Sequence, residues 1–87
     1  MHKTQPTQAE KDARAKAKLD TGQQLAEEYL AEGQALRSSA KRRDMAGVQA
    51  HDERRREIKR TARTRGCYTE FGDACERMNR YQEGGGT

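Results

Sequence analysis

Residues 36–48 read LRSSAKRRDMAGV, and this segment decides how the chain is expected to fold. The basic run 41–43 interrupts the helix-forming residues, and Asp44 is a residue type that caps the start of a helix. No proline falls within residues 8–39, so one long helix is expected there, and a second over residues 45–65. Because the turn between them is short, the sequence predicts an antiparallel helical hairpin.

The first predicted helix has clear signals at its start and a thin apolar face. Thr7 and Glu10 fit a capping box, in which a hydroxyl and a carboxylate three residues later accept hydrogen bonds from free backbone amides at the helix start. Asp20-Thr21-Gly22 leaves open whether the helix is broken. After this point, apolar and small residues recur at helical spacing: Gly22, Leu25, Ala26, Tyr29, Leu30, Gly33, Leu36 and Ala40.

The second predicted helix has an inward stripe spaced three and four residues apart: Val48, His51, Arg55, Ile58 and Ala62. Gly66 suits the left-handed stop after it. Two readings of Arg55 stay open. In the first, its methylenes pack in the interface while the guanidinium reaches the solvent-exposed edge. In the second, the guanidinium pairs with Glu27, Glu28 or Glu32, either on the facing helix or on a second subunit. His51 is read as half-buried, with a pH-switch role as the alternative.

A shorter third helix is expected over residues 70–82, with Thr69 as its N-cap. Its apolar face is Phe71, Ala74, Cys75, Met78 and Tyr81. The chain therefore reads as a flexible N-terminus over residues 1–6, a single helical domain over residues 7–83 and a flexible glycine-rich tail over residues 84–87.

Large apolar residues are scarce. Leu, Ile, Val and Phe together supply seven of 87 residues, so the fold class predicted is all-α with its burial completed by homodimerisation. A chain that folds only on its partner is a further possibility at this composition. The residues expected in the core or dimer contact are Leu25, Tyr29, Leu30, Leu36, Val48, Ile58, Phe71, Met78 and Tyr81.

Charge is concentrated in residues 37–65, which hold eleven of the eighteen Lys and Arg residues and only four acids. That stretch carries a net charge of +7, whereas the segments on either side are slightly acidic. Arg56, Lys59, Arg60 and Arg63 share one helix face. Asp52 and Glu53 can pair with Arg56, and Glu57 with Arg60, yet these acids cannot neutralise the row.

A cation row of this kind predicts a non-enzymatic protein that binds DNA or RNA through phosphates. The alternative is an adaptor or inhibitor, of the kind small mobile elements encode, that docks an acidic surface of a larger target. A merely solvated helix face is the third reading. No aromatic residue interleaves the basic stretch, and the nearest is Tyr68. The predicted binding residues are Lys41, Arg42, Arg43, Arg56, Lys59, Arg60, Arg63 and Arg65.

No catalytic motif, phosphate-binding loop or membrane-spanning stretch is found, so neither an enzyme, a cofactor, a small-molecule substrate nor a membrane partner is expected. The two cysteines do not have zinc-ligand spacing, so no metal is expected. Cys75 is read as a small core residue, and Cys67, beside Gly66, as an exposed thiol. The absence of a secretory signal favours the cytoplasm.

Overall fold

The computed structural model describes residues 7–85, with side chains described through residue 80, and every regular element in this range is a helix. The helices are α1 (Gln8–Lys41), α2 (Met45–Thr64) and α3 (Tyr68–Gly85). The all-α class predicted from the sequence is therefore confirmed. The predicted flexible N-terminus lies outside the described residues. No helix of the described range is long and apolar enough to cross a bilayer.

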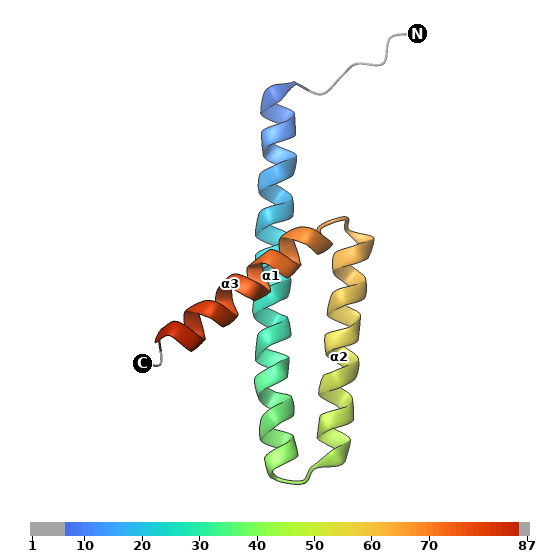
Figure 1. Ribbon diagram of the computed structural model, residues 1–87. Helices are drawn as coiled ribbons and strands as arrows, with labels where there is room; N and C mark the ends of the chain where they lie inside the picture. The colour runs from blue at the N-terminus through green and yellow to red at the C-terminus, as the bar shows by residue number, and fades with distance from the viewer. Residues whose placement is uncertain (1–6, 86–87) are drawn as a thin grey trace.

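Helix α1 supports the other two helices. α2 returns alongside its second half, and α3 crosses it near the middle (Figure 1). Both shorter helices pack mainly on α1 and touch each other little. The first part of α1 projects beyond them, and residues 7–20 are exposed along their whole length (Figure 1). We call residues 8–20 the α1 arm.

Gly22 marks the crossing of two helices, not a break in α1, which is continuous from Gln8 to Lys41. A Cβ atom at Gly22 would lie 2.8 Å from the backbone nitrogen of Phe71 and 2.9 Å from the carbonyl carbon of Glu70. A side chain would collide with backbone at those distances. α3 can approach α1 here only because the residue is glycine.

Backbone hydrogen bonds close both turns in the same way. At the end of α1, the Asp44 amide donates to the Ser39 carbonyl at 2.8 Å, and the Arg43 amide donates to the Ala40 carbonyl at 3.0 Å. This pair of bonds is a Schellman motif, which requires a left-handed residue. That residue is Arg43, with φ of 59°. An arginine therefore occupies a position where glycine is usual.

The second turn uses the residue type that the sequence predicts. Gly66 has φ of 70°. The Cys67 amide donates to the Ala62 carbonyl at 2.9 Å, and the Gly66 amide donates to the Arg63 carbonyl at 3.1 Å.

Side chains cap the starts of α1 and α2 as expected. The hydroxyl of Thr7 accepts from the Glu10 amide at 3.2 Å, and the carboxylate of Asp44 accepts from the Gly47 amide at 3.0 Å.

The ends of α3 differ from those predicted. The Phe71 amide already donates to the Cys67 carbonyl at 2.9 Å, so Thr69 lies inside the first turn and is not the N-cap. The C-terminal end lies at Gly85, beyond the predicted end at residue 82, so the predicted flexible tail begins inside the helix. Glycine lowers helix stability by about 1 kcal/mol per residue but does not forbid helical bonding.

Small residues make up most of the core. Six residues form the buried apolar cluster, and only two of them are large: Leu25, Ala26, Ala62, Cys67, Phe71 and Ala74. Cys67 is 1 % exposed, so the predicted exposed thiol is wrong. Its position after Gly66 turns it inward onto the last turn of α2, where the Schellman motif brings an apolar contact. Small side chains let helix axes approach closely, so the core needs few large residues.

Candidate polyanion-binding face

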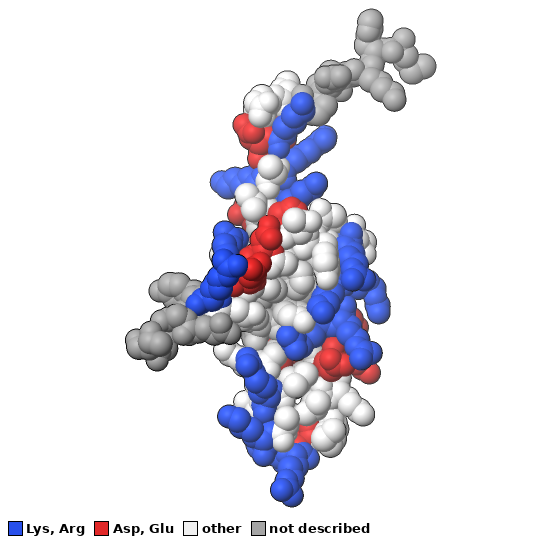
Figure 2. All heavy atoms as spheres, viewed as in Figure 1, with Lys and Arg blue, Asp and Glu red and all other residues white. Residues whose placement is uncertain are grey.

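Four cations of α2 lie on its outer side. Arg56, Lys59, Arg60 and Arg63 are all exposed. Figure 2 shows Lys and Arg atoms along the flank of α2 and around the turn between α1 and α2. We call this surface the basic face; it consists of Lys41, Arg42, Arg43, Arg56, Lys59, Arg60, Arg63 and Arg65, all of them exposed.

Few acidic residues neutralise the basic face. Arg56 pairs with Asp52 across one helical turn, with 3.1 Å between nitrogen and oxygen. The pairings of Arg56 with Glu53 and of Arg60 with Glu57, which the sequence allows, are not among the ion pairs of the described side chains. Arg60 has no acidic partner within this part of the chain. The face therefore keeps most of its positive charge.

Aromatic rings lie beside these cations, although none interleaves them in the sequence. The guanidinium of Arg63 lies 4.8 Å from the ring centre of Tyr68, and the ammonium of Lys59 lies 5.4 Å from that of Tyr29. The rings belong to α3 and α1, outside the basic stretch, so the residues of that stretch give no sign of these contacts. Only Tyr29 gave a signal in the sequence, as a member of the apolar stripe of the first helix; Tyr68 lay outside the predicted third helix.

Arg55 packs on an aromatic ring and not on a glutamate. Its guanidinium carbon lies 4.0 Å from the ring centre of Tyr29. A Cβ atom at Gly33 would lie 3.4 Å from the same group, so the glycine leaves room for it. The buried Nε of Arg55 has no hydrogen-bond partner among the described residues. Of the two readings left open for Arg55, pairing with a glutamate of α1 is not found among the ion pairs of the described side chains. The guanidinium makes a cation–π contact instead.

Glu32 instead accepts from two other residues of α2. His51 Nδ1 lies 2.5 Å from one carboxylate oxygen, and Arg54 donates to the other at 3.3 Å. The hydrogen bond from His51 holds the pKa of the Glu32 carboxyl below its ordinary range, and Arg54 contributes in the same direction against the opposing effect of desolvation. This group joins the middle of α1 to α2.

The lowered pKa of Glu32 predicts a pH-dependent contribution to stability. The folded carboxyl binds its proton more weakly than the unfolded one, so stability rises with pH through this window. The contribution is complete above the unfolded pKa and disappears as the pH falls through the folded pKa. Glu32→Gln should lower the free energy of unfolding by about 1 kcal/mol at neutral pH. The difference from the parent should vanish in acid.

Urea unfolding at a series of pH values measures this difference. Glu53→Gln is the matched control, because Glu53 is exposed and belongs to no ion pair of the described side chains. A difference between parent and Glu32→Gln that stays constant from neutral to acidic pH would contradict the prediction.

The predicted core residues differ in burial. Leu25 is 8 % exposed and Phe71 is 3 % exposed. Tyr81 belongs to α3, but its side chain lies outside the described residues. The other six are half-buried: Tyr29, Leu30, Leu36, Val48, Ile58 and Met78.

The two thiols offer little reactivity. Cys67 is buried, and desolvation raises the pKa of Cys75 although Arg55 and Lys59 oppose the shift. Among the described residues, no three His, Cys, Asp or Glu side chains gather in a way that could hold a metal ion.

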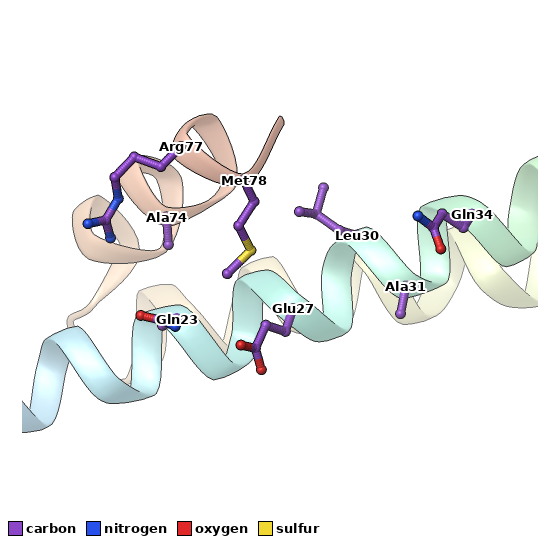
Figure 3. A pocket seen from close by; sticks show the side chains of 8 residues that line it. All are labelled: Gln23, Glu27, Leu30, Ala31, Gln34, Ala74, Arg77 and Met78. Atoms are coloured by element: carbon purple, nitrogen blue, oxygen red, sulfur yellow. The ribbon is translucent and has the colours of Figure 1, made fainter. Parts of the chain in front are cut away.

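A groove lies between α1 and α3 on the side away from the cation row. It has a volume of about 530 Å³. Figure 3 shows Met78 and Ala74 pointing from α3 toward α1, with Leu30 beside them. The remaining lining residues are Gln23, Glu27, Ala31, Gln34 and Arg77. Leu30 and Met78 are half-buried because α1 and α3 do not close on each other along this groove.

Comparison of this chain with family models, with curated proteins and with solved structures finds no match.

Proposed function

We propose that the chain is a small, non-enzymatic, cytoplasmic binding protein whose basic face engages DNA or RNA through phosphate contacts. The observation that carries the proposal is the imbalance of charge on the outer side of α2. Four exposed cations follow one another at helical spacing, and only Arg56 has an acidic partner among the described side chains. Cations whose charge no acidic side chain offsets are available to neutralise phosphates and release their counterions.

The dimensions of α2 fit a phosphate backbone. The helix spans Met45–Thr64, which corresponds to about 30 Å at 1.5 Å per residue. The turn cations lie at one end of this length and Arg65 lies at the other. A surface of this length can meet several successive phosphates on one side of a duplex or along a single strand.

The turn between α1 and α2 gives independent support. Arg43 is held at a positive φ, a conformation that raises the energy of a residue with a side chain by about 1–2 kcal/mol. Glycine would avoid this strain. A strained, exposed arginine beside Lys41 and Arg42 favours a binding role for its charge.

A second candidate is an adaptor or inhibitor that docks an acidic protein surface. The observation in its favour is Met45, which is 64 % exposed at the start of α2, two residues after Arg43. An exposed apolar side chain next to cations suits a protein interface better than a phosphate backbone.

Charge reversal tests the proposal. Arg56→Glu/Arg60→Glu should lower the affinity for a duplex oligonucleotide by at least tenfold and flatten the log–log salt dependence by about 0.9 for each lost contact. The helical circular dichroism should stay unchanged, because exposed ion pairs contribute only about 0–1 kcal/mol. Fluorescence anisotropy across salt concentrations measures both effects.

The α1 arm supplies a matched control. Arg14→Glu/Lys18→Glu reverses two exposed cations at the same four-residue spacing and changes net charge equally. The control should bind nearly as the parent does. Equal losses in the two double variants would show that only net charge matters, and full binding by Arg56→Glu/Arg60→Glu would exclude the basic face.

A companion variant separates stability from binding at the turn. Arg43→Gly removes the strained side chain, so it should raise the free energy of unfolding by about 1 kcal/mol. The same change should weaken oligonucleotide binding, since it removes one cation of the basic face. A variant that is stabilised and binds as tightly as the parent would remove Arg43 from the proposed surface.

We also propose that the antiparallel helical hairpin and its shorter third helix associate as a homodimer. Support comes from apolar side chains that the single chain leaves partly uncovered: Leu30 and Met78 line the α1–α3 groove, and Leu36 is half-buried. A second copy would cover them. Sedimentation at several concentrations should give a mass that rises to that of two chains, and a stable monomer at micromolar concentration would refute the association.

A further inference from the structure

Three of the four aromatic residues of the chain form one contiguous line. The ring centres of Tyr29 and Phe71 are 5.4 Å apart in an edge-to-face arrangement. Those of Phe71 and Tyr68 are 5.9 Å apart with tilted planes. The line begins on α1, passes through the core and reaches the surface at the first residue of α3. Burial is greatest in the middle of the line: Tyr29 is half-buried, Phe71 is 3 % exposed and Tyr68 is 40 % exposed.

Three cations of α2, spaced four residues apart, lie along this aromatic line. Arg55 and Lys59 lie over Tyr29, and Arg63 lies over Tyr68. The first two contacts involve a half-buried ring and serve packing between helices. The contact of Arg63 with Tyr68 differs, since both side chains are exposed. The cation row of the basic face and the aromatic line therefore meet at the surface at Tyr68.

An exposed ring at the edge of a cation row has the chemistry that single-strand binders use. The cations follow the phosphates, and the ring provides a flat apolar surface on which an unpaired base stacks. Bases inside a duplex already stack on their neighbours and cannot reach such a ring. The buried Phe71 fixes Tyr68 from behind, which limits the freedom that the ring would lose on binding.

We infer that Tyr68 is a base-stacking site for single-stranded nucleic acid, with Arg60, Arg63 and Arg65 holding the phosphates on either side of the stacked base. The inference rests on the proposed function, because it names the form of nucleic acid that the basic face would select. Arg63 would then lie over one face of the ring, as it does now, while the base stacks on the other face, and its remaining donors would reach a phosphate.

Two substitutions at one position isolate the stacking contribution. Tyr68→Leu keeps an apolar side chain but removes the ring, and Tyr68→Phe keeps the ring but removes the hydroxyl. The probes are labelled oligothymidylate and oligouridylate of about 12 nucleotides, within the usual site sizes, and a duplex of equal length. Anisotropy titrations give the affinities, and helical circular dichroism checks that each variant is folded.

Tyr68→Leu should bind oligothymidylate about fivefold to 150-fold more weakly than the parent, the range expected for loss of one stacked base. Its duplex affinity and its salt dependence should stay unchanged, because no phosphate contact is lost. Tyr68→Phe should bind as the parent does. If Tyr68→Leu weakens the binding of oligouridylate to the same extent, the stacking site accepts RNA as well as DNA. If it weakens the binding of only one of the two oligonucleotides, the site is specific for that nucleic acid.

Other outcomes overturn the inference in distinguishable ways. If folded Tyr68→Leu binds single strands as tightly as the parent, the stacking site is wrong and the basic face stands. If single-strand and duplex affinity fall equally, Tyr68 acts through packing and the site is likewise wrong. If the parent binds neither form of nucleic acid, the proposed function fails together with this inference.

Discussion

Phe71→Ala is expected to remove about 3–5 kcal/mol from the free energy of unfolding, the range for truncating a buried phenylalanine. Phe71 is 3 % exposed and lies between the rings of Tyr29 and Tyr68, so its loss leaves a cavity and breaks two aromatic contacts. Small domains are stable by only about 5–15 kcal/mol. The variant should therefore melt far below the parent or be unfolded at room temperature.

Urea unfolding followed by circular dichroism measures this effect. Leu19→Ala serves as the control, since Leu19 is large and apolar but 52 % exposed on the α1 arm. The control should change stability by no more than about 0.5 kcal/mol. If Phe71→Ala melts within a degree or two of the parent, α3 is not docked on α1 in solution.

The second large effect is expected at Gly22. Gly22→Ala would place a Cβ atom 2.8 Å from the backbone nitrogen of Phe71, so α3 must move away. Overpacking of this kind lowers stability by about 1–3 kcal/mol, and the better helix propensity of alanine returns about 1 kcal/mol. We expect a net loss of up to about 2 kcal/mol, measured by urea unfolding.

Gly72 provides the matched control for this prediction. It also lies inside a helix, but a Cβ atom there would meet no atom of the described part of the chain within 4 Å. Gly72→Ala should therefore raise stability by up to about 1 kcal/mol. Opposite signs for the two glycine variants would support the close crossing at Gly22. A gain in both would mean that the helices are farther apart.

Features that depend on neighbouring residues could be predicted from the sequence. Thr7, Asp44 and Gly66 act through hydrogen bonds or backbone angles within a few residues, so the sequence predicted their roles at helix ends. The inward stripe of the second helix was readable for the same reason, since helical spacing alone places Ile58 and Ala62 on one side.

Features that depend on distant residues could not be predicted. Gly22 has the same sequence context whether it breaks a helix or admits a crossing one, and only the position of α3 decides. Arg55 could reach several glutamates by length, but its guanidinium lies over the ring of Tyr29. For the basic face, the sequence predicts which cations share one side of a helix. It does not predict that Tyr68 lies beside them, because that contact needs the turn at Gly66.

The α1 arm has a consequence for how the protein responds to temperature. Starting a helix is unfavourable, since several residues must be ordered before the first hydrogen bond forms, whereas each added residue extends a helix at little net change in free energy. The arm continues a helix that packing against α2 and α3 already holds, so it avoids the nucleation step. The length of the arm therefore depends only on the free energy of adding each further residue to the helix. Warming should shorten it gradually from the Thr7 end, well before the packed part of the molecule melts in a single cooperative step.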